Sequence, residues 1–195
     1  MKRFLLISLA SLLLLSCSKS NNVDNKKGPV AVDLGLSVKW APYNIGATSP
    51  ADAGSFFSWG ETSEKTSYSK DSYSSASNDI ATVKWGAPWR MPTLAEVEEL
   101  VNKCSWTVTV KNRVNGYEIK GPNGNTIFLP AAGWKTGDQH VNIGSDGIYW
   151  TGTLYTDNTQ AYILYLGQDY QSKKWEYWPS RNVRHAGYTV RAVCP

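Results

Sequence analysis

The first strong hydrophobic feature of the chain is a largely apolar run, Phe4–Leu15, which follows two basic residues and is followed closely by Cys17. A helix needs about 20 apolar residues to cross a bilayer, so this run is too short to span one. A basic start, a short apolar run and a small residue before a cysteine are typical of a lipoprotein signal. We predict that residues 1–16 are removed and that Cys17 becomes a lipid-carrying N-terminus. The alternative is an ordinary cleaved signal with an incidental cysteine.

Polar positions dominate the following segment, residues 17–29, which has almost no apolar content. Such a segment cannot offset the entropy lost on ordering, so the pattern predicts a flexible tether. Regular apolar positions begin near Val30, and residues 30–195 are predicted to form the folded part. This length suits one domain with a hydrophobic core and is short for two.

The clearest helical pattern begins after Pro92. Thr93 and Glu96 have the spacing of a capping box, and apolar residues follow at helical intervals. The pattern predicts a helix that ends near Asn102 or Lys103. Beyond it the apolar period changes from helical to two, which predicts a half-buried strand around Trp106–Lys111.

Turn signals divide the chain beyond this strand. Asn115-Gly116 and residues 122–125 predict turns, because asparagine and glycine accept positive φ. The segments 117–120 and 126–130 therefore read as a hairpin. Further strands are predicted at Ile148–Tyr155, Gln160–Leu166 and Tyr188–Cys194.

The part of the chain before the helix contains two extended apolar segments, residues 32–45 and 55–60. A Ser-rich stretch without apolar periodicity follows at 61–79, which predicts a long solvated loop. The predicted class is α+β, with mostly antiparallel strands, one or two helices and long loops.

The net charge of +4 does not describe the folded part. Five of the 20 basic residues and one of the 16 acidic residues precede residue 29, which leaves fifteen of each sign. A neutral domain lacks the phosphate attraction on which nucleic-acid binding rests. We therefore exclude nucleic acid as a partner, and the membrane is expected to be contacted through lipid on Cys17.

Three phrases together resemble a known family: Trp85–Thr93 (WGAPWRMPT) before the predicted helix, residues 127–133 (IFLPAAG) and residues 187–193 (GYTVRAV). They look like the C-type-lectin-like fold in its formylglycine-generating-enzyme-like branch, including the "major paralogous domain" lipoproteins of gut bacteria. The resemblance implies that the first and last strands pair and that ligands are met by a long, irregular loop region.

Cys104 and Cys194 form an even pair once Cys17 carries lipid, in a compartment where disulfides persist. We expect them to bond, although two buried free thiols are equally compatible with their spacing. C-type-lectin-like domains often tie their helical part to the last strand by a disulfide, so the resemblance also implies this bond.

The sequence shows no catalytic or metal-binding pattern. The oxidase chemistry of the branch needs a spare pair of thiolates, and the calcium-binding triplets of sugar-binding C-type lectins are missing. The two histidines, His140 and His185, have no partner at a recognisable spacing. A glycosidase pair would have to be assembled in space from scattered acids. These acids are Asp138, Asp146, Asp157 and Asp169. We expect no enzyme activity and no cofactor.

Aromatic residues supply the candidate binding site, since the chain has nine Trp and eleven Tyr but four Phe. Tyr162 and Tyr165 lie in an apolar run and are expected to be packing residues. In residues 168–185 polar side chains interrupt the rings and Pro179 is expected to break any strand, so the rings cannot all be buried. Rigid rings and arginine dominate binding hot spots. The predicted ligand-binding residues are Tyr170, Trp175, Tyr177, Trp178 and Arg181. The alternative is that Trp175 and Trp178 fold back as a lid over the core.

These observations favour a lipid-anchored module of the cell envelope that recognises a protein or glycan ligand without catalysis. A structural subunit of a fimbria or surface complex is the second hypothesis, and an enzyme of the formylglycine-generating-like or glycosidase class is the third. The expected location is the outer membrane, with the periplasmic or outward face left open. Some relatives of this branch are diversified near the C-terminus, and residues 155–185 are a candidate for such a region.

Overall fold

The computed structural model describes residues 28–169 and 171–195. The predicted signal, the lipidation site Cys17 and most of the tether lie outside the described residues. Within them the helices are α1 (Ile80–Trp85) and α2 (Leu94–Lys103). The strands are β1 (Lys39–Trp40), β2 (Ser105–Lys111), β3 (Val114–Lys120), β4 (Thr126–Pro130), β5 (Trp134–Thr136), β6 (Gln139–Val141), β7 (Asp146–Leu154), β8 (Gln160–Gln168), β9 (Trp175–Val183) and β10 (Val193–Cys194). Neither helix is long and apolar enough to cross a membrane.

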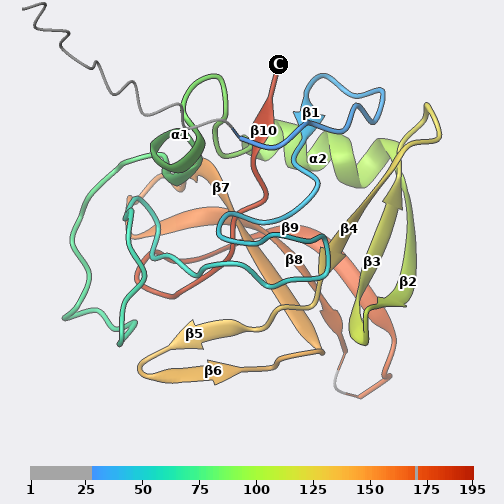
Figure 1. Ribbon diagram of the computed structural model, residues 1–195. Coiled ribbons are helices and arrows are strands. Elements are labelled where there is room, and N and C mark those ends of the chain that lie inside the picture. Colours follow the sequence, from blue (N-terminus) through green and yellow to red (C-terminus); the bar gives the residue numbers. More distant parts are fainter. Residues whose placement is uncertain (1–27, 170) are drawn as a thin grey trace, which may run out of the picture.

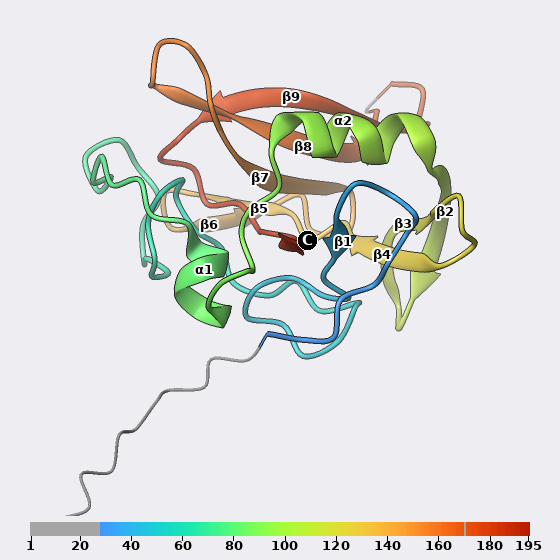
Figure 2. The same ribbon diagram turned by 90° about the horizontal axis from the view of Figure 1, so that it is seen from above.

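The strands form small antiparallel sheets with the orders β1-β10, β2-β3-β4, β5-β6 and β7-β8-β9. The α+β class with mostly antiparallel strands is therefore confirmed. β1 pairs with β10, so the first and last strands of the described chain lie together, as the resemblance implied (Figure 1). α2 packs along the β7-β8-β9 sheet, and α1 and the β2-β3-β4 sheet lie toward opposite ends of the molecule (Figure 2).

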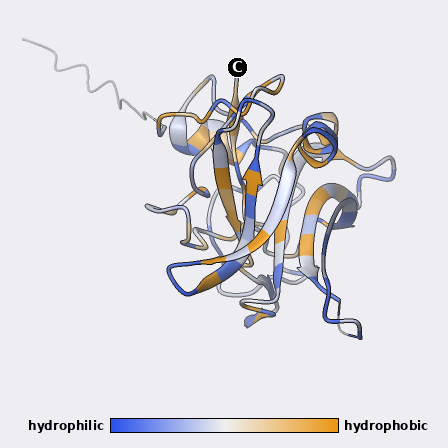
Figure 3. Ribbon diagram, turned by 90° about the vertical axis from the view of Figure 1, so that its right-hand side faces the viewer, coloured by the Kyte–Doolittle hydropathy of each residue, from blue (hydrophilic) through white to orange (hydrophobic). Residues whose placement is uncertain are grey.

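The central strand β8 is covered on both faces, which confirms the prediction that it is internal. Its residue Ile163 belongs to a buried cluster that includes Ile80 of α1, which we call the α1-side cluster. The next residue, Leu164, belongs to a second cluster that includes Leu100 of α2, the α2-side cluster. Successive strand residues point to opposite faces, so two apolar neighbours serve two cores. Apolar and polar positions follow one another along the strands in Figure 3.

The predicted helix is present as α2. Thr93 caps it, and Thr93 and Glu96 form the expected reciprocal capping box. Glu96 also forms an ion pair with Arg90 at 2.5 Å, which ties the segment before the helix to its first turn. The shorter helix α1 was not predicted. Its N-cap is Asp79, at the end of the Ser-rich stretch, whose carboxylate accepts hydrogen bonds from two backbone N–H groups of the first turn.

The predicted turn at Asn115-Gly116 is wrong, because both residues lie inside β3. The β2–β3 hairpin turns earlier, at Asn112 and Arg113, where φ is 51° and 67°. Gly116 instead serves close packing: a Cβ at this position would lie 2.3 Å from the carbonyl oxygen of Leu129 in β4. The glycine therefore marks a close approach of two strands, and not a turn.

Two further predictions need correction. Pro179 does not break a strand, since β9 runs through it. β9 is an edge strand, where a residue without an N–H is tolerated.

The Ser-rich stretch 61–79 contains no regular element before its helix cap, but it is not simply a solvated loop. Tyr68 is 1% exposed, and its hydroxyl donates to the carbonyl oxygen of Phe56 at 2.7 Å.

Candidate functional site

The structure divides the predicted binding residues between the two faces of β9. Tyr170 lies outside the described residues. Trp175 and Tyr177 face the α2-side cluster and pack against it. Trp178 pairs in register with Tyr165, which packs against the α1-side cluster. The surface of Trp178 is 42% exposed. The predicted residues therefore do not form one surface.

Trp175 and Tyr177 are half-buried, and their rings are engaged in packing within the fold. The ring of Tyr177 stacks on Trp106 of β2, with centroids 4.1 Å apart and an angle of 10° between the planes. Tyr117 of β3 contacts both rings edge-on, at 5.2 Å from Tyr177 and 5.9 Å from Trp175. These rings join the β2-β3-β4 sheet to β9. The lid alternative therefore describes the packed Trp175 better than Trp178, which is 42% exposed.

Arg181 is exposed but lies apart from Trp178. Its guanidinium is 4.3 Å from the centre of the Tyr155 ring, and it pairs across the sheet with Tyr162. Tyr155 and Tyr162 contact each other edge-on at 5.7 Å. This is a cation–π arrangement that covers the far end of the sheet. Tyr162 is half-buried, and its ring contact is with Tyr155.

Trp178 borders a cleft of about 560 Å³ at the end of the sheet where β8 finishes and β9 begins. Tyr165 is its aromatic neighbour, with ring centroids 4.7 Å apart and planes tilted by 44°. The polar side chains lining the cleft come from the turn before β7, the first residue of β7, the strands β8 and β9, and the connection between those two strands. They are Asn142, Ser145, Asp146, Gln168, Asp169, Lys173 and Glu176.

Asp146 is the buried carboxylate of this cleft, with 8% of its surface exposed. The hydroxyl of Tyr165 donates to Oδ1 at 3.1 Å, and the amide of Asn142 donates to Oδ2 at 2.6 Å. Asn142 has a φ of 56°, and its carbonyl oxygen accepts the backbone N–H groups of Ser145 and Asp146. This turn holds the amide against the carboxylate. Each oxygen of Asp146 therefore accepts a hydrogen bond from a fixed donor, which meets the need of a buried carboxylate for hydrogen-bond partners.

Gly167 makes this arrangement possible. It pairs in register with Asp146, and a Cβ on it would lie 2.2 Å from the hydroxyl of Tyr165 and 2.6 Å from Oδ1 of Asp146. Any larger residue would therefore occupy the space in which the tyrosine and the aspartate meet. The cleft therefore depends on a glycine near the end of β8, within the hydrogen-bonded part of the sheet.

The electrostatics of the cleft are acidic. Burial, and then the charge and hydrogen bond of Asp146, raise the pKa of Tyr165 to about 12, so its hydroxyl remains a donor at neutral pH. Hydrogen bonds from Ser172 lower the pKa of Asp169 and keep it ionised. With Glu176, the lining contains three carboxylates and one lysine. Such a cleft offers acceptors and a ring to a ligand rich in O–H donors.

The same geometry bears on the glycosidase hypothesis. Retaining and inverting glycosidases need one carboxyl group that is protonated and acts as an acid. Asp146 accepts hydrogen bonds on both oxygens, and the pKa of Asp169 is lowered, so both are arranged as acceptors. In residues 28–169 and 171–195, no group of three or more His, Cys, Asp and Glu is placed to hold a metal ion.

The expected bond between Cys104 and Cys194 is absent, because both cysteines are free in the structure. Cys104 follows the last residue of α2, whereas Cys194 lies next to Val193, which pairs with Arg90 just before the first turn of that helix. Ten helical residues span about 15 Å, and a disulfide needs Cα atoms within about 7 Å. The helix therefore holds the two thiols apart. Burial raises the pKa of both.

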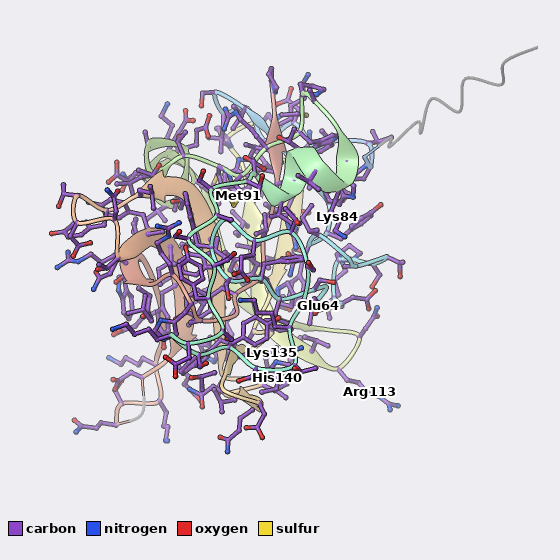
Figure 4. All side chains as sticks on the ribbon, turned by 90° about the vertical axis from the view of Figure 1, so that its left-hand side faces the viewer. Glu64, Lys84, Met91, Arg113, Lys135 and His140 are labelled. Atoms are coloured by element: carbon purple, nitrogen blue, oxygen red, sulfur yellow. The ribbon has the colours of Figure 1, made fainter. Side chains whose placement is uncertain are left out.

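His140 belongs to a different face, shown with Lys135 and Glu64 in Figure 4. Its Nε2 lies 2.7 Å from the carbonyl oxygen of Ala132, and its ring contacts Phe56 edge-on at 4.7 Å. Lys135 lies 3.8 Å from the carboxylate of Glu64 and 5.1 Å from the centre of the Phe56 ring. These contacts account for the side chains without a ligand.

Sequence reasoning found Trp178 but missed its partners. In the sequence, Asp146 was one of several scattered acids, and Tyr165 was predicted to be a packing residue. Tyr165 does pack on the α1-side cluster, but its hydroxyl also donates a hydrogen bond to Asp146. The signal was weak because Tyr165 and Trp178 meet Asp146 only through the register of three strands. Comparison with known proteins gave no family model, no curated protein and no solved structure that matches this chain.

Proposed function

We propose that this chain is a lipid-anchored, noncatalytic binding module of the cell envelope, and that it recognises a glycan through the Trp178 cleft. The membrane part of the proposal is supported by the N-terminal sequence, in which a short apolar run ends just before Cys17. The resemblance to C-type-lectin-like lipoproteins supports the same type of function. The outer membrane is the proposed location, on either face.

The observation that carries the proposal is the pairing of the exposed Trp178 with the hydrogen-bonded Tyr165–Asp146 pair in one cleft. A sugar ring has an apolar C–H face, which an indole ring can cover. It also has hydroxyl groups at its edge, which can donate hydrogen bonds to carboxylate and amide oxygens. Ligand sites combine these two features: an apolar wall and a few polar groups fixed in direction.

The shape of the cleft favours a small ligand over a protein surface. Its volume of about 560 Å³ is within the range of small-molecule sites, which runs from about 300 to 1,000 Å³. A stable protein interface needs about 800 Å² from each partner and a centre of several exposed anchors. Here Trp175 and Tyr177 are used for packing, which leaves Trp178 as the exposed ring of β9.

The test is a glycan array probed with the chain purified in detergent, followed by titration of the sugars that bind. Trp178→Ala and Asp146→Asn should each weaken binding at least tenfold, which corresponds to about 1.4 kcal/mol. Arg181→Ala is the matched control, because it removes an exposed side chain of the same strand from outside the cleft. Binding that survives Trp178→Ala, or that is lost with Arg181→Ala, contradicts the proposal. Co-purification of a stoichiometric protein partner would instead favour the surface-complex hypothesis.

A further inference from the structure

A second cavity lies at the opposite end of the β7-β8-β9 sheet. It has a volume of about 420 Å³ and is lined by the Ser-rich stretch, the turn before β8 and the residues that follow β9. Thr159, in its lining, and Gly167, in the Trp178 cleft, are eight residues apart along β8, which corresponds to about 25 Å. The two sites are therefore separate.

Arg184 is the central side chain of this cavity, and it is 8% exposed. Its Nη1 donates to the carbonyl oxygen of Asn158 at 2.9 Å, and its Nη2 donates to that of Ala76 at 2.8 Å. Its Nε is buried and has no hydrogen-bond partner. No carboxylate of the described chain lies within ion-pair distance of it. A buried cation is costly unless an anion or a full set of acceptors compensates it.

Arg191, the other buried arginine, shows what full compensation looks like here. Its Nε donates to Asn44 and its two Nη atoms donate to backbone carbonyl oxygens, so every nitrogen has an acceptor. Arg191 is a structural residue of the core. Arg184 differs in having a vacant donor and in lining a cavity.

The surroundings of Arg184 add a lysine, an imidazole and ring surface. Lys70 and His185 line the same cavity. The guanidinium lies 4.6 Å from the Trp59 ring centre and 5.2 Å from that of Tyr73, which also forms part of the cavity wall. Glu61 is the buried acid of this region, but its carboxylate is paired with Lys65 at 2.6 Å. Asp157, beside the turn, is exposed and accepts from the backbone of Thr159.

We propose that this cavity binds the carboxylate of an acidic sugar, of the uronic or sialic acid class. A carboxylate in the cavity would supply the anion that Arg184 lacks, with the ammonium group of Lys70 adding attraction and the imidazole of His185 able to form a hydrogen bond. The ring of Tyr73 would cover the C–H face of the sugar, and the hydroxyls of Ser75 and Thr159 would meet its hydroxyl groups. The volume suits a single sugar residue.

This site has the opposite charge to the Trp178 cleft, whose lining is mainly acidic. The inference stands whether or not that cleft binds a glycan. If both sites are used, the chain would recognise a glycan with neutral and acidic residues in different places.

The test is calorimetric titration of the full chain with glucuronate and N-acetylneuraminate, beside glucose as the neutral analogue and a short peptide with a free C-terminal carboxylate. The acidic sugars should bind, and glucose should bind at least tenfold more weakly. Arg184→Gln should weaken the acidic sugars at least tenfold, whereas Arg181→Gln, which removes the same charge from outside the cavity, should leave them unchanged. Trp178→Ala should also leave them unchanged, which separates this result from that of the cleft.

Arg184 also donates hydrogen bonds to two backbone carbonyl oxygens, so its substitution can disturb the fold. Folding of Arg184→Gln is therefore checked by circular dichroism. If that variant does not fold, Lys70→Gln tests the site instead. Lys70 is exposed and makes no ion pair in the described chain, so its substitution should not affect folding. It should weaken the acidic sugars about threefold with an unchanged melting temperature. Equal binding of glucose and glucuronate, no binding of any acidic sugar, or binding of the peptide alone would overturn the proposal.

Discussion

The hydroxyl of Tyr165 in β8 donates a hydrogen bond of 3.1 Å to Oδ1 of Asp146 at the start of β7, beside the exposed indole of Trp178. This contact links the sheet to the candidate site, since the tyrosine packs on the α1-side cluster and its hydroxyl fixes the buried carboxylate. Five predictions test the role of this contact, of the rings around it and of the cysteines.

Tyr165→Phe should keep the ring beside Trp178 but leave one oxygen of Asp146 without its donor. A buried acceptor that loses its partner costs about 1–3 kcal/mol, so the free energy of unfolding should fall by about that amount. Denaturant unfolding measures it. Tyr155→Phe is the control, because the structure gives the Tyr155 ring contacts and no hydroxyl hydrogen bond; this variant should change stability by less than about 0.5 kcal/mol. Equal effects of the two variants would contradict the role assigned to Tyr165.

Tyr177→Ala and Trp178→Ala should separate packing from binding. Tyr177 stacks on Trp106 and contacts Tyr117, so its loss should reduce the free energy of unfolding by about 2 kcal/mol or more. Trp178 is 42% exposed, and its loss should cost about 1 kcal/mol or less. Thermal unfolding of the two variants side by side gives the comparison. A larger loss for Trp178 would make it part of the core.

Gly167→Ala should disrupt the cleft, because the new Cβ would lie 2.2 Å from the Tyr165 hydroxyl and 2.6 Å from Asp146. The tyrosine or the aspartate must then move, and we expect loss of glycan binding together with a stability loss of about 1–3 kcal/mol. Gly152→Ala in β7 is the matched control, since its Cβ would be 3.6 Å from the nearest atom, an ordinary contact. Full binding by Gly167→Ala would show that the Tyr165–Asp146 contact is not needed.

Stability should fall at alkaline pH. The folded-state pKa is about 12 for Tyr165 and for Tyr117, mainly because both are removed from water, whereas tyrosine in the unfolded chain titrates near 10. The folded protein keeps protons that the unfolded chain releases, so this contribution is present below pH 10 and is lost as the pH rises toward about 12. Denaturant midpoints between pH 9 and 11.5 should decrease, and less steeply in Tyr165→Phe. A midpoint independent of pH over this range would contradict the raised pKa.

Reductant should leave the melting temperature unchanged, because Cys104 and Cys194 are free and held apart by α2. Both thiols should react with an alkylating reagent slowly in the folded protein, since burial raises the pKa of each, and rapidly in denaturant. Mass spectrometry after alkylation gives the number of modified thiols. A drop in melting temperature with reductant would restore the bond that the sequence suggested.

The sequence by itself determined the features that depend on neighbouring residues. The capping box at Thr93 and Glu96, the period-two pattern after it and the α+β class were all readable, because helix caps and strand alternation follow local spacing. The internal strand around Tyr162 and Tyr165 was also readable, since a run with large groups on both faces needs two covering layers.

Only the tertiary structure decided which rings are free and which are packed. Trp175, Tyr177 and Trp178 look alike in the chain, but strand geometry turns the first two onto Trp106 and Tyr117 and leaves the third beside Asp146. The same applies to Gly116, which lies close to β4, and to Gly167, which lies close to Asp146 of β7. It also applies to Arg184, whose lack of an ion-pair partner is visible only once the surrounding carboxylates are placed. These properties arise from contacts between distant segments, and the register of the strands fixes them.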